Sequence, residues 1–232
     1  MLSADGIVSL RSVRFFVLVI IFIAISALVA SGATTEFDES VTEAVVEASG
    51  NPAADAVVTV VTTSADLFPI YFSPMIIFSF ILILRRKTRR IGAILLLILA
   101  LSTFAYTQVK GVVDRERPPY EFKPNIGFDY EPERDVLSRF ASSFPSGHAT
   151  RSAAFALVVG YMLRNRSVGG VNAGMLMWAF PASIAFTRLY MGAHYPTDVI
   201  AGVLLGLIVA NALGRILKFE RPANIDRQES SR

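Results

Sequence analysis

Long stretches without a charged residue constrain this chain most. The stretch between Arg14 and Glu36 holds 21 residues, and so does the stretch between Arg166 and Arg188. Two others, 67–84 and 91–109, hold 18 and 19 residues. A helix needs about 20 mainly apolar residues to cross the hydrocarbon core of a bilayer. Only 18% of all residues are charged, against about 25% in soluble domains. The pattern therefore predicts a membrane protein.

Two shorter uncharged runs complete the prediction. They are Ser152–Leu163, with 12 residues, and Val199–Gly214, with 16. Extending the first run back to Ser146 gives a helix about 27 Å long, and Pro196 suits the first turn of the second. We therefore predict an all-α fold, a six-helix transmembrane bundle that forms one integral-membrane domain over residues 1–232. The expected spans are about 14–33, 67–84, 91–109, 146–163, 167–187 and 196–214.

The first span also resembles a signal peptide, because small residues follow it. Its apolar core of about 17 residues is long for a signal peptide, and keeping it leaves an even number of spans, so we favour an uncleaved anchor. The next segment, 34–66, alternates acidic with small apolar residues. This pattern predicts an amphipathic segment that lies on the membrane surface and is broken at Asn51-Pro52.

Basic residues predict the orientation, because they gather in the cytoplasmic loops of membrane proteins. With the N-terminus inside, the inner segments 1–14, 85–90, 164–166 and 215–232 hold 14 of the 22 Lys and Arg residues, and the outer segments hold 15 of the 19 acidic residues. We therefore expect a cell-membrane protein with both termini in the cytoplasm. The segments 31–66, 110–151 and 188–198 then face outward.

Three polar clusters stand at the outer ends of the expected spans. They comprise Lys110 with Arg117-Pro118, then Pro145-Ser146-Gly147-His148, and then Arg188, His194 and Asp198. Each cluster alone also has an ordinary structural explanation, as snorkelling cations, a helix cap or an interfacial ion pair. The chain has only two histidines and no cysteine. This composition excludes a thiolate zinc site and a cysteine nucleophile.

Taken together, the clusters favour a phosphate site. A helix that begins at Ser146-Gly147 presents unpaired N–H groups and the positive end of its dipole, and glycine lets the backbone approach closely. The planar guanidinium groups of Arg117 and Arg188 can each donate two hydrogen bonds to phosphate oxygens, and the ammonium group of Lys110 adds a positive charge.

The third cluster also predicts a nucleophile. Asp198 follows His194 by four residues, so its carboxylate can bind one imidazole nitrogen and leave the other free. An imidazole oriented in this way toward a clamped phosphate is an activated nucleophile. The second histidine, His148, is then available to protonate the leaving oxygen.

The three clusters resemble the signature of the type 2 phosphatidic acid phosphatase superfamily. This chain carries it as Lys-x6-Arg-Pro, Pro-Ser-Gly-His and Arg-x5-His-x3-Asp, with Thr187 where the family has serine. The resemblance implies that His194 forms a phosphohistidine, that Asp198 orients it, and that His148 is first the acid and then the base for water. The residues expected to hold the phosphate are Lys110, Arg117, Ser146, Gly147 and Arg188. We expect no metal and no cofactor, since the fixed cations stabilise the transition state.

We therefore predict metal-independent hydrolysis of lipid phosphates or diphosphates at the outer membrane face. The resemblance is greatest to undecaprenyl-diphosphate phosphatases, so an isoprenoid diphosphate ranks first, ahead of phosphatidate and phosphatidylglycerol phosphate. The expected partners are a phosphorylated membrane lipid and the bilayer, with no nucleic acid, and the oligomeric state stays open.

Alternatives from other classes are an anionic-lipid transporter and a catalytically inactive relative. A transporter would place its charges near the membrane midplane, and an inactive relative would be expected to lose the nucleophile or a cation. Soluble vanadium haloperoxidases share the motif residues, but the apolar spans argue against them.

Overall fold

The computed structural model describes residues 13–66, 73–120 and 142–216, and in these ranges the chain is mostly helical, as predicted. The elements are α1 (Val13–Ala30), α2 (Thr35–Glu47), α3 (Pro52–Thr63), α4 (Pro74–Leu84), α5 (Arg89–Lys110), α6 (Gly147–Leu163), β1 (Ser167–Val168), β2 (Val171–Asn172), α7 (Ala173–Leu176), α8 (Ala179–Tyr190) and α9 (Pro196–Ile216).

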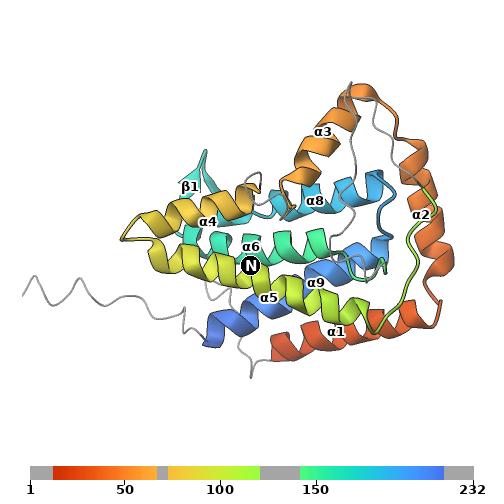
Figure 1. Cartoon of the computed structure of the whole chain (residues 1–232), viewed down its shortest axis with the longest axis horizontal. Coiled ribbons are helices and arrows are strands. Elements are labelled where there is room, and N and C mark those ends of the chain that lie inside the picture. The colour runs from red at the N-terminus through yellow and green to blue at the C-terminus, as the bar shows by residue number, and fades with distance from the viewer. Residues whose placement is uncertain (1–12, 67–72, 121–141, 217–232) are drawn as a thin grey trace, which may run out of the picture.

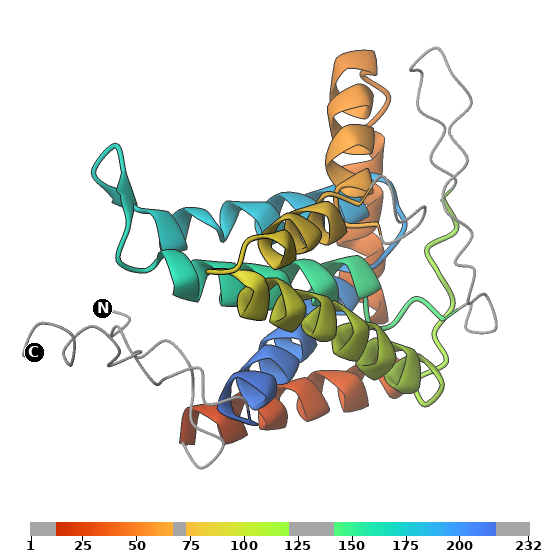
Figure 2. The same ribbon diagram turned by 60° about the vertical axis from the view of Figure 1, so that its left-hand side comes forward.

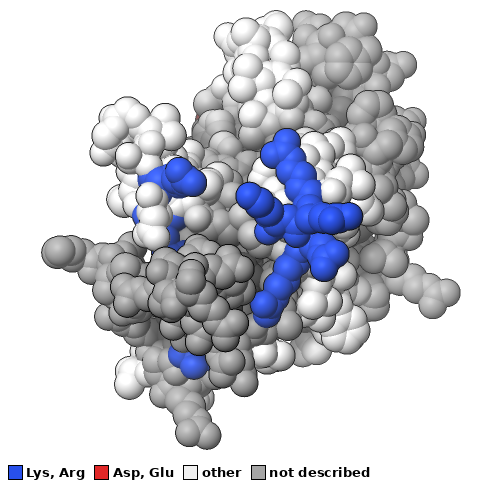
Figure 3. All heavy atoms as spheres, turned by 90° about the vertical axis from the view of Figure 1, so that its left-hand side faces the viewer, with Lys and Arg blue, Asp and Glu red and all other residues white. Residues whose placement is uncertain are grey.

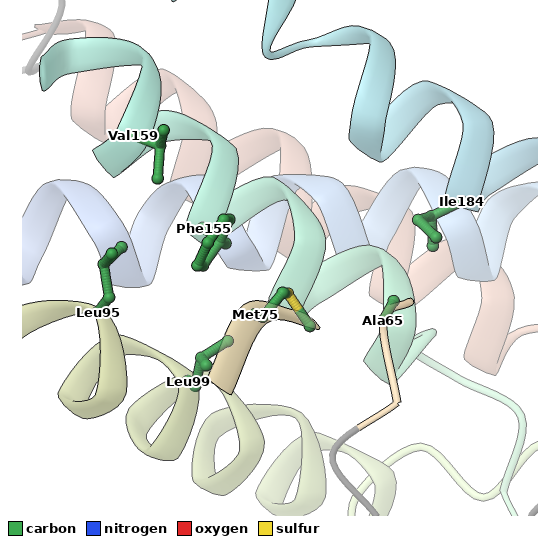
Figure 4. Packing of buried hydrophobic residues seen from close by; sticks show 7 residues of the cluster. All are labelled: Ala65, Met75, Leu95, Leu99, Phe155, Val159 and Ile184. Carbon is green, nitrogen blue, oxygen red and sulfur yellow. The ribbon is translucent and has the colours of Figure 1, made fainter. Parts of the chain in front are cut away.

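Helix α6 lies at the centre of the bundle. It packs against α5, α8 and α9, while α4 packs on α5 and α1 packs on α9 (Figure 1). The main apolar cluster fills the space between these helices (Figure 4). It comprises Met75 from α4, Leu95 and Leu99 from α5, Phe155 and Val159 from α6, Ile184 from α8, and Ala65 after α3.

The backbones of α6 and α9 approach each other closely at two glycines of α9. A Cβ atom at Gly202 would lie 2.5 Å from the carbonyl oxygen of Ser146, and one at Gly206 would meet the carbonyl oxygen of Thr150. Small residues let membrane helices pack in this way. The contact brings the start of α6 to the start of α9, where the backbone N–H of Ser146 donates to the carbonyl oxygen of Asp198 at 3.0 Å.

Helices α2 and α3 cover one end of the bundle. The chain bends by 89° between α1 and α2, so α2 runs across the ends of the bundle helices (Figures 1 and 2). The predicted break at Asn51-Pro52 separates α2 from α3. Pro52 begins α3, and the side chain of Asn51 accepts hydrogen bonds from Ala53 N and Ala54 N at 3.0 and 3.2 Å. Asparagine is a favoured cap, and proline suits the first helical turn.

The opposite end of the bundle is strongly basic. The connection between α4 and α5 lies there, together with the β1–β2 hairpin (Figure 1). Lysine and arginine side chains gather on this end, and no acidic side chain of the described residues is visible on it (Figure 3). The exposed residues of this basic connection are Arg85, Arg86, Lys87, Arg89 and Arg90.

The expected fifth span, 167–187, is not one continuous helix, which corrects the prediction. Residues Ser167–Val168 and Val171–Asn172 pair as antiparallel strands. The turn between them consists of Gly169 and Gly170, whose φ angles of 57° and 80° are ones that glycine adopts readily. An absence of charge marks an apolar stretch but does not require that the whole stretch be helical.

The apolar helices are those of a membrane protein. By length and composition, α5 and α9 suffice to cross a bilayer among the described residues, and the bent pair α1 and α2 also passes when taken together. Helices α3 and α4 are shorter apolar helices. The second expected span begins at residues 67–72, which lie outside the described ranges. The count of six spans therefore stays a prediction.

Candidate active site

His194 and Asp198 lie at the junction of α8 and α9, at the end of the bundle that α2 covers. After α8 the chain turns at Gly192, whose φ is 59°. The backbone N–H groups of Ala193 and His194 then both donate to the carbonyl oxygen of Arg188, at 3.1 and 3.3 Å. This turn buries the His194 side chain, which is 3% exposed, and brings its Nδ1 to 3.6 Å from Oδ2 of the buried Asp198.

The carboxylate of Asp198 is held by several donors. Its Oδ2 accepts from the hydroxyl of Ser143 and from the backbone N–H of Tyr195, the latter at 2.9 Å. Its Oδ1 accepts from Nη1 of Arg115 at 2.8 Å. The distance of 3.6 Å from Oδ2 of Asp198 to Nδ1 of His194 is longer than a hydrogen bond. Ser143, Tyr195 and Arg115 hold the carboxylate in place, and the imidazole faces it.

Three cations predicted from the motifs surround His194. Lys110 ends α5, is 3% exposed and donates from Nζ to the carbonyl oxygen of Ser142 at 2.7 Å. Arg117 donates from Nη1 to the carbonyl oxygen of Ala193 at 3.1 Å. Arg188 donates from Nη1 to the hydroxyl of Thr62 at 2.9 Å.

The surroundings of His194 keep its imidazole neutral. Burial lowers the pKa of His194 well below its ordinary value, and the positive charges of Arg117, Arg188 and Lys110 lower it further. A neutral imidazole has a lone pair to offer, whereas an imidazolium has none. At neutral pH the group is therefore in its nucleophilic form.

The second motif begins α6 beside this pair. A Cβ atom at Gly147 would lie 2.9 Å from the ring of Tyr106, so only glycine fits this approach. The hydroxyl of Ser146 is buried, and the described residues give it no hydrogen-bond partner. Nε2 of His148 makes a short contact with Oδ1 of Asp66, and both side chains are 14% exposed.

Asp66 is ionised in this setting. Burial alone would raise the pKa of its carboxyl group, but the hydrogen bond to His148 and the positive charges of Arg188 and Arg151 lower the pKa below its ordinary value. The carboxylate and the histidine therefore form a charge-assisted pair at the start of α6.

Sequence reasoning missed several residues of this end. Arg115, Asp38, Asp66, Thr62 and Arg151 all contact site residues or their neighbours. Arg115 lies inside the first cluster, and Arg151 is a charged residue beside an apolar run, so both carried a signal. The other three come from the segment 34–66, and no local pattern shows which distant residue an acid will meet.

Among the described residues, no three or more histidine or acidic side chains gather as metal ligands would. Charge that could act on a phosphate comes instead from Lys110, Arg117 and Arg188, which all act on His194. The arrangement joins a neutral buried imidazole, a carboxylate behind it, a second histidine and several fixed cations. These are the groups that an in-line displacement at phosphorus requires.

The fold matches that of a solved membrane phosphatase. The crystal structure of a transmembrane PAP2-type phosphatidylglycerolphosphate phosphatase from Bacillus subtilis has a TM-score of 0.71 to this chain at 20% identity. The alignment covers 92% of this chain and 100% of the other. At this identity the likeness establishes the shared fold.

Sequence comparisons extend the likeness. Phosphatidylglycerophosphatase B of Bacillus subtilis is 25% identical over 83% of this chain and 89% of its own length. Lipid A 4'-phosphatase of Porphyromonas gingivalis is 27% identical over 63% of this chain, which spans 60% of that relative, less than two thirds of it. The model of the PAP2 superfamily matches residues 91–222, more than half of the chain. The family resemblance drawn from the three motifs is thereby confirmed, and the chain belongs to the PAP2 superfamily.

Proposed function

We propose that this chain is a membrane phosphatase that hydrolyses phosphorylated lipids through a phosphohistidine, without a metal ion. The observation that carries the proposal is the setting of His194. Its imidazole is buried and neutral, Asp198 lies behind Nδ1 at 3.6 Å, and three cations surround it. Membership of a superfamily whose named relatives here are lipid phosphatases supports the same reaction.

The first half-reaction transfers the phosphoryl group to His194. Because Nδ1 faces Asp198, the lone pair of Nε2 attacks phosphorus and forms the N–P bond. The P–O bond to the lipid breaks, and its electron pair leaves with the oxygen. His148 gives that oxygen a proton. Asp198 stabilises the positive charge that develops on the attacking ring.

The second half-reaction regenerates the enzyme. His148, now neutral, accepts a proton from water as the water oxygen attacks phosphorus. The P–N bond breaks and its electron pair returns to Nε2 of His194, which frees inorganic phosphate. Asp66 accepts from the same Nε2 of His148 that serves the leaving group. The leaving oxygen of the substrate therefore takes the place of this carboxylate.

The cations hold the phosphate throughout. In this proposal the guanidinium groups of Arg117 and Arg188 each donate two hydrogen bonds to the phosphate oxygens, and Lys110 attracts the phosphate by its positive charge. Ser146 and Gly147 add donors at the start of α6, where the helix dipole favours an anion. Fixed positive charges aimed at the phosphoryl oxygens supply the stabilisation that a metal ion would otherwise give.

The substrate is a phosphorylated membrane lipid. An isoprenoid diphosphate ranks first, because an outward-facing site in a small six-span protein resembles undecaprenyl-diphosphate phosphatases most, and phosphatidate and phosphatidylglycerol phosphate are the alternatives. The relative matched over 83% of this chain, named phosphatidylglycerophosphatase B, favours phosphatidylglycerol phosphate among these alternatives. Phosphate release from a panel of purified lipid phosphates in detergent, with EDTA present, ranks the candidates.

The site faces outward in the cell membrane, with both termini in the cytoplasm and six spans. The support is the basic connection Arg85–Arg90, which lies at the end of the bundle opposite to α2 (Figures 1 and 3). Short basic loops stay in the cytoplasm. The outward-facing end is then the one that holds His194.

The two histidines separate this reaction from transport and from an inactive scaffold. His194→Ala should leave no turnover with any substrate, since it removes the attacking nitrogen. His148→Ala should lower the rate with a lipid monophosphate by about 10²–10⁴-fold, because an alkoxide needs a proton to leave. With nitrophenyl phosphate the first step should suffer much less, since nitrophenolate leaves without a proton.

The measurement is rapid-quench kinetics on the purified variants. The His148→Ala enzyme should release a burst of about one equivalent of nitrophenolate and accumulate an acid-labile, base-stable phosphoenzyme. A burst in the His194→Ala enzyme instead would reverse the two roles. Turnover by the His194→Ala enzyme at the wild-type rate would end the proposal.

A further inference from the structure

Arg115 joins two buried carboxylates. Its Nη1 donates to Oδ1 of Asp198 at 2.8 Å, and its Nη2 donates to Oδ2 of Asp38 at 2.7 Å. Both carboxylates are fully buried. The guanidinium also lies 4.1 Å from the ring centre of Tyr195 and donates to the hydroxyl of Thr197 at 2.9 Å. A planar group held on both edges and one face has a fixed orientation, so it fixes the carboxylates in turn.

Asp38 reaches the same place from α2. Besides Arg115 it accepts from the backbone N–H of Thr197 at 3.0 Å and from the Thr197 hydroxyl at 2.6 Å. The N–H of Thr197 lies in the first turn of α9, where backbone donors have no partner within the helix. Asp38 therefore caps α9 from 159 residues earlier in the sequence. It fixes the turn from which Asp198 projects.

The charges alternate along this chain of contacts. Asp38 is negative, Arg115 positive and Asp198 negative, and the ring of His194 becomes positive as it attacks phosphorus. Without Asp38, Arg115 would have Asp198 as its one carboxylate partner among the described residues. The interaction of Asp198 with the positive ring of His194 would then be weaker. Without Arg115, two buried carboxylates would lose their shared counter-ion, and burying an unpaired charge is costly.

We propose that Arg115 and Asp38 are positioning residues for the reaction, which hold Asp198 in the orientation that directs Nε2 of His194 at phosphorus. The inference rests on the proposed function, since it assumes that His194 is the nucleophile. It also makes α2 part of the active site, although this helix precedes the matched region 91–222. Arg115 occupies one of the six unspecified positions of the first motif, and Asp38 lies outside all three motifs.

The experiment compares variants that keep the side-chain size. Arg115→Lys retains the charge but cannot bind both carboxylates, and Asp38→Asn retains the cap oxygen but loses the charge. Each should lower kcat by about 10- to 100-fold, a loss comparable to that on removing an outer group that orients a metal-binding histidine. The KM should change less than threefold, and so should the inhibition constant of vanadate, which binds in place of the phosphoryl group, because neither residue holds the phosphate.

A matched control lies on the neighbouring helix. Asp55 of α3 is another buried carboxylate of the outer segment, and it accepts from the hydroxyl of Tyr190 at 2.8 Å. Asp55→Asn should lower the thermal midpoint while leaving kcat unchanged, since Asp55 has no bond to Asp198. The double variant Asp38→Asn with Arg115→Lys should lose less in kcat than the product of the single losses, because the two act as a unit.

The outcomes separate the inference from the proposed function. If His194→Ala is inactive but both single variants keep the wild-type kcat, the positioning role is wrong and the nucleophile stands. A raised KM with unchanged kcat also overturns it, because it makes these residues substrate ligands. Should Asp38→Asn fail to fold, Asp38→Glu decides in its place, since it keeps the charge but shifts the carboxylate. A wild-type kcat in that variant overturns the positioning role, and a reduced kcat at unchanged KM supports it.

Discussion

Replacing Gly202 by alanine tests whether the close approach of α6 and α9 sets the geometry of the site. The added Cβ would lie 2.5 Å from the carbonyl oxygen of Ser146 and 3.0 Å from Cβ of Ala149. Ordinary contacts begin at 3.4 Å, so the helices must separate by about 0.9 Å. The opposing oxygen belongs to the backbone and cannot rotate away.

This separation moves the proposed catalytic groups apart. Ser146 and His148 lie at the start of α6, while Asp198 lies in the first turn of α9. The shift therefore changes the distance between the proposed proton donor, His148, and the carboxylate behind the proposed nucleophile, His194. A misplacement of about 1 Å costs on the order of 10²-fold in rate. We therefore expect Gly202→Ala to lower kcat by about 10²-fold while the purified protein remains folded.

Gly92→Ala is the matched control. A Cβ atom there would meet the carbonyl oxygen of Ser79, a backbone clash between α4 and α5, the helices that the basic connection joins. It should lower the thermal midpoint at least as much as Gly202→Ala, yet leave kcat within about threefold of wild type, since effects at distant independent sites are separable. The assay is nitrophenyl phosphate turnover in detergent beside a thermal melt. Equal loss of kcat in both variants, or a wild-type kcat in Gly202→Ala, refutes the reasoning.

Two further predictions follow from the charges. In a His148→Gln variant His194 is the sole histidine, so its imidazole gives the single histidine signal in an NMR titration. The titration midpoint of His194 should lie well below the ordinary value of about 6.5. Adding Lys110→Ala should raise this midpoint, because it removes a positive charge near the imidazole. A midpoint at the ordinary value would contradict the cation-rich setting. A cysteine at Thr35 should react with an impermeant thiol reagent in intact cells, whereas one at Thr88 should react only after permeabilisation. Labelling at Thr88 in sealed cells would reverse the orientation.

The sequence could predict those parts of the site that depend on local pattern. Each motif is a few residues long and stands at the end of an apolar stretch, so spacing alone indicated that both histidines and three cations lie near helix ends. The structure places His148 and His194 at the same end of the bundle, with the pKa of His194 lowered by the cations. Spacing did not predict the hairpin at 167–172, because an uncharged run containing Gly169-Gly170 also reads as part of a span.

The partners of the outer segment could not be predicted, because each joins residues far apart in the chain. Asp66 meets His148 across 82 positions, and Thr62 meets Arg188 across 126. An amphipathic pattern shows that one face of a helix will be covered but does not show by what. The sequence therefore predicted a segment lying on the membrane surface, whereas in the structure this segment also contacts His148 and Arg188.

These contacts explain why the outer segment carries buried and half-buried acids. Asp38, Asp55 and Asp66 all come from it, and their partners lie in the rest of the chain: Arg115, Tyr190 and His148. A buried carboxylate is stable only where donors or cations meet it, so the segment has one well-defined place on the bundle.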